Sequence, residues 1–203
     1  MNLSKLFHSA GGDQKVYLIA GLGNPGGQYR QTRHNVGFMA LDRLAERLEV
    51  KFSRLENKAL VAKADHQGNR VILAKPHTYM NLSGQSIGAL LRFYKVPHSN
   101  FLVCYDDVDL PLGTIRLRPG GGSAGQKGMV SIIERIGTEE FPRLRLGIGR
   151  PPGRMDAAAY VLQDFSAAEK EILPEALERA VDAILLFISE SLEAAMNRYN
   201  GTG

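Results

Sequence analysis

Short runs of apolar residues alternate along the chain with segments in which apolar residues recur at helical spacing. The short runs predict strands, because buried strands are typically about four to eight residues long. The expected strands cover residues 16–20, 59–64, 70–74, 101–105, 114–117 and 144–148. Turn-forming residues at 65–69 predict that the second and third of these strands form a hairpin.

The helical spacing predicts helices over residues 36–48, 83–94, 129–136 and 166–199. Ser166 is a favourable N-cap for the last of these segments. Within that segment, Pro174 predicts the start of a new helix, because proline disrupts a helix interior but is tolerated in a first turn.

Because strands alternate with helices, we predict an α/β fold in a single domain. The expected architecture is a twisted, mixed and partly parallel β-sheet covered by helices on both faces, and the domain is expected to cover residues 15–200. Residues 1–14 are polar and contain glycine, so they are expected to form a flexible N-terminal extension rather than a signal peptide.

The composition is consistent with one hydrophobic core in a reducing compartment. Of the 203 residues, 44% are hydrophobic, yet no apolar run approaches the roughly 18–20 residues that cross a membrane. The only cysteine, Cys104, excludes an internal disulfide and a cysteine-rich metal site. We therefore expect a cytoplasmic protein without membrane contact. The net charge of +4 and the pI of about 9.2 favour a polyanionic partner only weakly.

Polar side chains are concentrated in loops that follow three of the predicted strands. The first loop is rich in glycine and holds Asn24, His34 and Asn35, whereas Asn81 and Asp106 follow later strands. Open α/β sheets place their chemistry at the carboxyl ends of strands, so we expect these side chains to share a cleft. There, His34 would take a proton from water, and Asp106 would fix its tautomer. Asn24 and Asn81 would hold a substrate carbonyl or a developing oxyanion.

Each of these residues also has a purely structural interpretation. A histidine in a polar loop is often a surface or capping residue, Asn24 suits a turn, and Asn81 suits a helix cap. Tyr79, Met80 and Phe38 favour loop packing over a stacking box for a ligand.

Other chemistries have less support in the sequence. The pattern Gly-x-Ser-x-Gly is absent, so water is the expected nucleophile. The glycine-rich stretch 120–128 matches neither the dinucleotide-binding pattern nor the Walker pattern. Asp106, Asp107 and Asp109 resemble a carboxylate cluster for Mg²⁺, although one catalytic carboxylate followed by turn residues is a simpler interpretation.

Basic residues gather around the glycine-rich stretch. They are Arg116, Arg118, Lys127, Arg143, Arg145, Arg150 and Arg154. A basic rim beside a cleft would suit a nucleic acid whose phosphates position it while chemistry occurs at one end. Solvated charges at strand edges are the structural alternative.

Four stretches occur together and in an order that is typical of one enzyme family. They are Gly21-Leu22-Gly23-Asn24-Pro25-Gly26 with Tyr29 and Thr32-Arg33-His34-Asn35, Lys75-Pro76 with Tyr79-Met80-Asn81-Leu82-Ser83-Gly84, Asp106-Asp107-Val108-Asp109-Leu110-Pro111, and Arg143-Leu144-Arg145-Leu146-Gly147-Ile148-Gly149. With these stretches the chain resembles bacterial peptidyl-tRNA hydrolase over nearly its whole length. The resemblance implies hydrolysis of the ester between a peptidyl, or N-blocked aminoacyl, group and the tRNA 3′ end. Such an enzyme recycles tRNA from stalled or aborted translation as a monomer, with no metal and no cofactor.

The resemblance also implies roles for individual residues. His34 would be the general base and Asp106 its partner, while Asn24 and Asn81 would hold the peptidyl carbonyls and the terminal nucleotide. Other residues would contact the substrate or the tRNA: Tyr29, Tyr79 and Met80 in the cleft, and Arg118 and Arg145 as a clamp for the tRNA 5′ phosphate. Arginine suits phosphate because its planar fork donates two parallel hydrogen bonds.

One position departs from the family pattern. The family often has Gly-His-Asn-Gly where this chain has Gly125-Gln126-Lys127-Gly128. Our hypothesis is that Lys127 supplies a cation to the oxyanion or to a tRNA phosphate, which leaves Gln126 to bind the water. The altered loop also allows a second interpretation, a non-catalytic relative similar to the plant organelle protein that assists RNA splicing. A third is a metal-dependent hydrolase built on the aspartates near residue 106.

Overall fold

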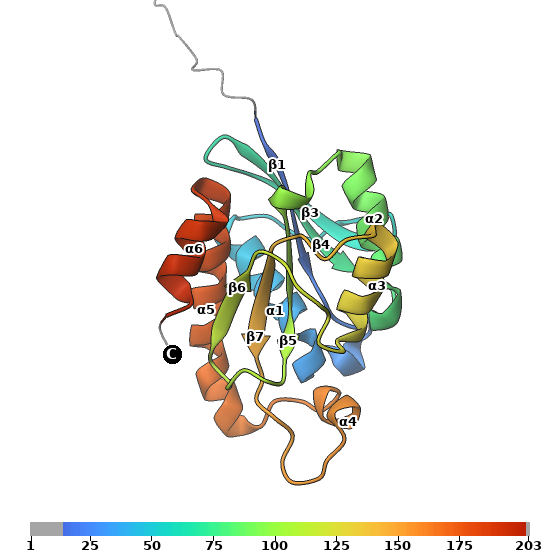
Figure 1. Ribbon diagram of the computed structural model, residues 1–203, viewed down its shortest axis with the longest axis vertical. Helices are drawn as coiled ribbons and strands as arrows, with labels where there is room; N and C mark the ends of the chain where they lie inside the picture. The colour runs from blue at the N-terminus through green and yellow to red at the C-terminus, as the bar shows by residue number, and fades with distance from the viewer. Residues whose placement is uncertain (1–13, 202–203) are drawn as a thin grey trace, which may run out of the picture.

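The six predicted strands and one more form a single seven-stranded mixed sheet in the computed structural model, which describes residues 14–201 (Figure 1). The strands are β1 (Val16–Gly21), β2 (Arg54–Glu56), β3 (Ala59–His66), β4 (Asn69–Pro76), β5 (Phe101–Asp107), β6 (Ile115–Arg118) and β7 (Arg143–Gly147). Their order across the sheet is β2-β3-β4-β1-β5-β7-β6. The four central strands are parallel to one another, and β2, β3 and β6 are antiparallel to their neighbours.

Residues 14–201 form six α-helices besides this sheet. They are α1 (Val36–Arg47), α2 (Ser83–Tyr94), α3 (Lys127–Ile136), α4 (Ala157–Val161), α5 (Ala167–Ser189) and α6 (Leu192–Tyr199). Four short 3₁₀ helices, η1 (Gly27–Tyr29), η2 (Arg33–Asn35), η3 (Met80–Leu82) and η4 (His98–Asn100), lie in connections. Figure 1 shows α2 and α3 on one side of the sheet and α5 and α6 on the other. The prediction of a mixed α/β sheet covered on both faces is therefore confirmed.

The core has two parts because neighbouring residues of a strand point to opposite faces. On β1, Ile19 packs with residues of α1 and α5, whereas Leu18 and Ala20 pack with residues of α2 and α3. The same alternation holds on β5, where Leu102 and Cys104 face the α1 side. Because of this alternation, Asp106 and Asp107 of β5 point to opposite faces, and Asp106 points to the α1 side.

The prediction that Pro174 begins a new helix is wrong. Helix α5 continues through it, from Ala167 to Ser189. A reciprocal capping box of Ser166 and Glu169 stabilises the first turn, as expected for a Ser166 N-cap. Beyond the proline, the helix buries Leu177, Ile184 and many neighbours, so packing outweighs the backbone hydrogen bond that proline cannot donate.

Two further elements, β2 and α4, are not among the predicted ones. Each is short, and periodicity is weak over so few residues. The predicted N-terminal extension, 1–14, lies outside the described residues except for Gln14, which donates a hydrogen bond to Asp65 (3.3 Å). Over residues 14–201, no helix is both long enough and apolar enough to cross a membrane.

The parallel strands place their carboxyl ends at one edge of the sheet. The loop with His34 follows β1, η3 follows β4, Asp106 is near the end of β5, and α4 comes after β7. Because β4, β1, β5 and β7 are successive neighbours, these four segments meet at one edge. This edge carries the site described next.

Candidate active site

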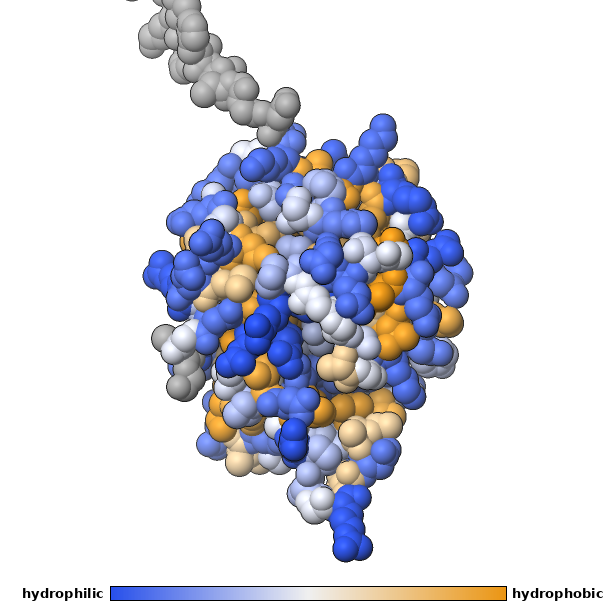
Figure 2. All heavy atoms as spheres, in the orientation of Figure 1, coloured by the Kyte–Doolittle hydropathy of each residue, from blue (hydrophilic) through white to orange (hydrophobic). Residues whose placement is uncertain are grey.

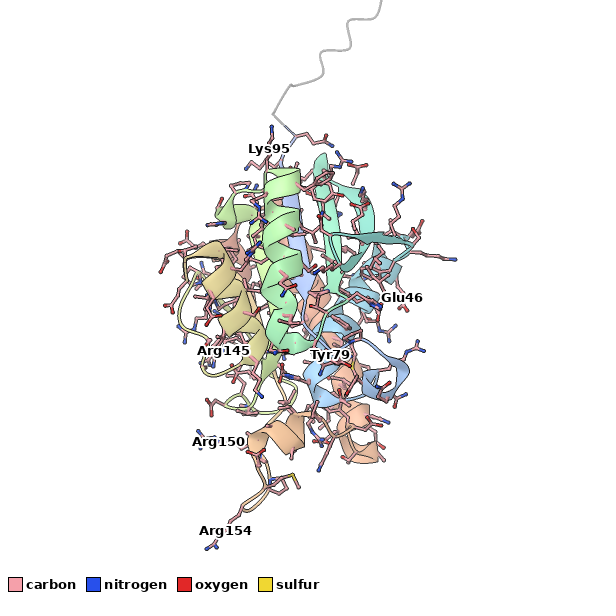
Figure 3. The ribbon with its side chains drawn as sticks, turned by 90° about the vertical axis from the view of Figure 1, so that its right-hand side faces the viewer. Glu46, Tyr79, Lys95, Arg145, Arg150 and Arg154 are labelled. Atoms are coloured by element: carbon pink, nitrogen blue, oxygen red, sulfur yellow. The ribbon has the colours of Figure 1, made fainter. Side chains whose placement is uncertain are left out.

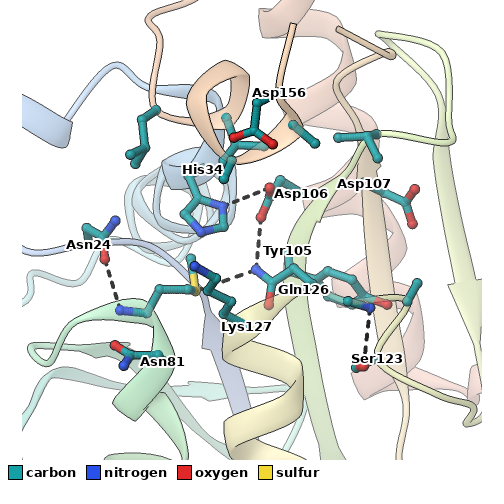
Figure 4. Close-up of a pocket in the computed structure, with 18 of the residues that line it drawn as sticks. Asn24, His34, Asn81, Tyr105, Asp106, Asp107, Ser123, Gln126, Lys127 and Asp156 are labelled. Carbon is teal, nitrogen blue, oxygen red and sulfur yellow. Dashed lines mark hydrogen bonds and ion pairs between the residues drawn. The ribbon is translucent and has the colours of Figure 1, made fainter. Parts of the chain in front are cut away.

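A cavity of about 620 Å³ opens at the carboxyl edge of the sheet (Figure 4). It is lined by side chains from all four segments, among them His34, Met80, Asp106 and Ala157. The start of α3 contributes a further wall through Gln126 and Lys127. The sequence-based expectation that separate strand ends share a cleft is confirmed by this arrangement.

His34 and Asp106 are in direct contact beside the cavity. The His34 Nδ1 lies 2.8 Å from the Asp106 Oδ2, and both side chains are buried. A carboxylate cannot donate, so this contact favours the tautomer with the proton on Nδ1. The Nε2 lone pair of His34 is then available to accept a proton.

Gln126 makes a second hydrogen bond to the same carboxylate. Its Nε2 donates to the Asp106 Oδ1 (3.0 Å), and its Oε1 accepts from the Met129 backbone N–H (2.8 Å) as the N-cap of α3. Figure 4 shows Gln126 beneath Asp106, on the side away from His34. Both polar ends of Gln126 are therefore engaged, and the hypothesis that this amide is left to bind water is not supported.

Asn24 is fixed by two neighbours. Asn35 accepts a hydrogen bond from the Asn24 backbone N–H (2.8 Å) and donates to its carbonyl (3.0 Å). The Asn24 Oδ1 accepts from the Met80 backbone N–H (2.9 Å), so its Nδ2 is the group left to meet a substrate carbonyl. The Asn35 amide is therefore committed to the backbone of Asn24.

Tyr79, Met80 and Asn81 enter the cavity from η3 and the residue before it. Tyr79 is 61% exposed, whereas Met80 is buried with its sulfur 3.5 Å from the Gln126 Nε2. The Asn81 side chain is exposed and makes no hydrogen bond within residues 14–201. All three therefore lie where the sequence analysis expects a substrate to bind.

Lys127 is the first residue of α3 and lines the cavity. Figure 4 shows its side chain pointing into the cavity toward His34. It is exposed, and within the described part of the chain its ammonium has no hydrogen bond or ion pair. In the described part of the chain, Lys127 thus brings to the cavity a positive charge that forms no ion pair.

The other aspartates of this region have partners of their own. Asp107 forms an ion pair with Arg145, and Asp109 pairs with Arg150 at 2.8 Å. Between residues 14 and 201, no group of three or more His, Cys, Asp or Glu side chains is arranged to hold a metal ion. The Mg²⁺ interpretation of Asp106, Asp107 and Asp109 finds no support in this arrangement, since each carboxylate bonds a different cation or amide.

Cys104 and Tyr105 precede Asp106 on β5. Burial raises the pKa of the Cys104 thiol far above its usual range, so it stays protonated in the core and is no nucleophile. Burial also raises the pKa of Tyr105, which lines the cavity as a neutral phenol. Water therefore remains the nucleophile that this site can activate.

The sequence profile of the family described as peptidyl-tRNA hydrolase matches residues 18–203. The chain belongs to the peptidyl-tRNA hydrolase family. It is 52% identical to the peptidyl-tRNA hydrolase of Chloroflexus aggregans over 186 residues, which cover 91% of this chain and 99% of that protein. It is 48% identical to that of Caldanaerobacter subterraneus subsp. tengcongensis over 92% of this chain and all of that one.

Solved structures agree with this assignment. The crystal structure of the peptidyl-tRNA hydrolase from Acinetobacter baumannii superposes with a TM-score of 0.87 at 34% sequence identity. The superposition covers 94% of this chain and 98% of that one. The resemblance inferred from four short stretches is therefore confirmed over the whole fold.

Not every residue that the resemblance to peptidyl-tRNA hydrolase implicates lies in the cavity. Tyr29 is half-buried at the end of η1 and is not a lining residue, so its predicted place in the cleft is not supported. Its backbone carbonyl accepts hydrogen bonds from the Thr32 backbone and hydroxyl (3.1 and 2.9 Å). Tyr29 therefore shapes the loop that leads to His34.

Arg118 and Arg145 lie on the neighbouring strands β6 and β7 and are not lining residues of the cavity. On paired β6 and β7, Arg116 faces Arg145 and Arg118 faces Arg143, so all four side chains lie on one face. Figure 2 shows a strongly hydrophilic area over these strands. Burial acts to lower the pKa of Arg145, but the ion pair with Asp107 has the larger effect, so the pKa of Arg145 is raised. Arg118 is exposed.

Sequence reasoning missed two residues that shape this site in a peptidyl-tRNA hydrolase. Asp156 lines the cavity and caps α4 by accepting from the Ala159 backbone N–H (3.1 Å). Arg33 is buried, stacks on Tyr160 (4.2 Å to the ring centroid) and pairs with Glu169 (2.6 Å). Aspartate before an alanine-rich run is an N-cap signal that the sequence offered, whereas nothing local marked Arg33 as an anchor.

Proposed function

We propose that this member of the family hydrolyses the ester that joins a peptidyl group to the 3′ end of tRNA, with His34 as general base. The observation that carries the proposal is the 2.8 Å contact between the His34 Nδ1 and the Asp106 Oδ2 at the wall of the cavity. Family membership supplies the substrate class. A non-catalytic relative would have no chemical need for this buried pair.

In the proposed mechanism, the His34 Nε2 takes a proton from water as the water oxygen attacks the ester carbonyl carbon. Asp106 stabilises the imidazolium through the contact at Nδ1. The tetrahedral intermediate then collapses, the bond to the 3′ oxygen breaks, and His34 returns the proton to that oxygen. Positioned acid–base catalysis of this kind contributes about 10²–10⁴ in rate.

Substrate binding is proposed to use the amides and the apolar side chains of the cavity. The Asn24 Nδ2 and the Asn81 amide would donate to peptidyl carbonyls or to the oxyanion, since neither group is committed within residues 14–201. Tyr79 and Met80 would contact the terminal nucleotide. A substrate without a peptide carbonyl would leave these amide donors unpaired, and unpaired buried donors cost free energy. The site would therefore favour N-blocked substrates.

Arg118 and Arg145 are proposed to bind a tRNA phosphate outside the cavity. They lie on the same face of β6 and β7, and arginine is well suited to phosphate. We also propose that the protein acts as a monomer in the cytoplasm, where translation produces its substrate.

The decisive experiment incubates the protein with N-acetylaminoacyl-tRNA and with its unblocked counterpart, with EDTA present throughout. We expect rapid release of the N-acetyl amino acid, slow release of the free amino acid, and no effect of the chelator. His34→Ala is expected to lower the rate by about 10²–10⁴. A wild-type protein inactive on the N-blocked substrate, or a His34→Ala variant as fast as the wild type, would contradict the proposal.

A further inference from the structure

We propose that Lys127 is a specificity-determining residue that rejects substrates with a positive charge next to the scissile ester. This inference rests on the proposed function. The α-nitrogen of an aminoacyl ester is two bonds from the carbonyl carbon that water attacks. It is a cation in free aminoacyl-tRNA and a neutral amide in peptidyl-tRNA. A fixed ammonium in the same cavity would therefore distinguish the two by charge.

The position of Lys127 supports this role. Its side chain points toward His34 (Figure 4), where the attacked carbonyl must lie for His34 to activate the water. Lys127 also occupies the first turn of α3, the end of a helix at which a cation is disfavoured. Its presence there brings no benefit to the helix, which is capped by Gln126 instead.

Within residues 14–201, no ion pair joins the Lys127 ammonium to a carboxylate of the cavity. Asp106 is bonded by His34 and Gln126, and Asp107 by Arg145. Asp156 accepts only the neutral Ala159 backbone N–H, so its negative charge stays on the α4 wall, and no ion pair joins it to Lys127 in the described chain. An incoming α-ammonium would thus meet a free positive charge on the α3 wall.

The size of the effect follows from Coulomb's law. Two unit charges several Å apart, at an effective dielectric constant of about 20, repel strongly enough to change a rate or an equilibrium tenfold or more. This discrimination would add to that of the amides of Asn24 and Asn81, which act through hydrogen bonds rather than charge. The two contributions can be separated by substrates that differ in charge alone.

The test uses three esters of one tRNA: phenylalanyl-tRNA, N-acetylphenylalanyl-tRNA and phenyllactyl-tRNA, which has a neutral α-hydroxyl in place of the ammonium. For each, kcat/KM is measured with the wild type, Lys127→Met and Lys127→Arg. We expect the wild type to prefer phenyllactyl-tRNA to phenylalanyl-tRNA. Lys127→Met should reduce that preference about tenfold, and Lys127→Arg should retain it.

Lys95→Met is the matched control, since it removes one exposed positive charge at the end of α2 (Figure 3). It should retain the wild-type preference. Lys127→Gln provides a second neutral variant in case Lys127→Met folds poorly, as judged by thermal unfolding. Agreement between the two neutral variants would support the proposal.

An unchanged phenyllactyl-to-phenylalanyl ratio in both neutral variants would overturn the proposal. If the ratio is unchanged and kcat falls for all three esters, Lys127 would instead stabilise the oxyanion. If the ratio is unchanged and KM rises for all three esters, Lys127 would instead bind a tRNA phosphate. These outcomes differ from failure of the proposed function itself. In that case the wild type would not release N-acetylphenylalanine at all.

Discussion

Asp106 faces His34 because side chains alternate along β5. Cys104 and Asp106 point to the face that α1 covers, and His34 lies just before α1. Asp107 points to the opposite face, where its partner Arg145 lies on the neighbouring strand β7. The parity of one position in the strand thus sets which carboxylate of β5 faces His34.

We predict that Asp106→Asn lowers kcat by about 10²–10⁴ and leaves KM nearly unchanged. The asparagine can keep the contact but cannot stabilise an imidazolium, and its amide favours the wrong tautomer of His34. Steady-state hydrolysis of N-acetylaminoacyl-tRNA measures both constants. Asp182→Asn, on the exposed side of α5, is the control. A loss confined to KM would argue against the assigned role.

Gln126 donates a hydrogen bond to Asp106, and we propose that it positions this carboxylate. We predict that Gln126→Glu lowers kcat about tenfold or more with little change in KM, because a carboxylate replaces the donor and repels Asp106. Glutamate keeps an acceptor for the Met129 N–H, so the cap of α3 is retained. A lowered kcat with an unchanged melting temperature would show that Gln126 acts by positioning Asp106 and not by stabilising the fold. An unchanged kcat would exclude this positioning role.

At the scale of elements, close packing of α1 on the sheet holds His34 near Asp106. Gly37 lies three residues after His34, and a Cβ there would lie 2.4 Å from the Cys104 carbonyl oxygen and 2.6 Å from the Leu22 backbone nitrogen. Backbone atoms cannot move aside as a flexible side chain can. Only glycine therefore allows this approach.

Gly37→Ala is expected to destabilise the fold by about 1–3 kcal/mol, as overpacking in a core does. It should also lower kcat, because α1 must move away from β5 and take His34 with it. Urea unfolding and steady-state kinetics measure the two effects. Gly27→Ala is the matched control, since a Cβ at Gly27 meets no atom within 4 Å. Equal stability of the two variants would contradict the packing argument.

Across the whole molecule, Arg33 joins the loop of His34 to the carboxyl-terminal part of the chain. Its guanidinium donates to the Gln163 and Asp164 carbonyls and pairs with Glu169. Burial acts to raise the pKa of Glu169, but hydrogen bonds from Arg33 and Ser166 outweigh it and hold this pKa below the usual 4.5. A carboxyl whose pKa is lower in the folded state stabilises the fold at pH values above its unfolded-state pKa.

The resulting prediction concerns stability against pH. Glu169→Gln should lower the melting temperature at neutral pH, and the difference from the wild type should shrink as the pH falls below about 4.5. Thermal unfolding from pH 7 to pH 3 measures it. Glu171→Gln, an exposed position in the same helix, is the control. A difference that is constant with pH would contradict the linkage.

The basic face of β6 and β7 predicts a salt-dependent contribution to tRNA binding. Arg118→Ala should raise KM for N-acetylaminoacyl-tRNA and reduce the slope of log KM against log salt by about one, as expected for one lost phosphate contact. Arg54→Ala, on the far edge strand β2, provides a control for net charge. If both variants had the same slope, Arg118 would not contact a phosphate.

Sequence alone determined the main helices and strands, the edge of the sheet that carries the chemistry, and the family. Hydrophobic periodicity is a local property, so α2 begins and ends where the pattern predicts it. Parallel strands have their carboxyl ends at one edge of the sheet, in whatever order the strands lie. The candidate residues at or after such strand ends are Asn24, His34, Met80, Asn81 and Asp106.

Only the tertiary structure decided which of these side chains touch. Gln126 bonds Asp106, and Tyr29 lies outside the cavity, although the sequence predicts both of them near the substrate. Such contacts join residues far apart in sequence. They depend on the order of the strands, on the face of the sheet to which each side chain points, and on how closely the helices pack on the sheet. Local sequence does not encode those quantities, so Arg33 and the continuous helix through Pro174 also became visible only in the fold.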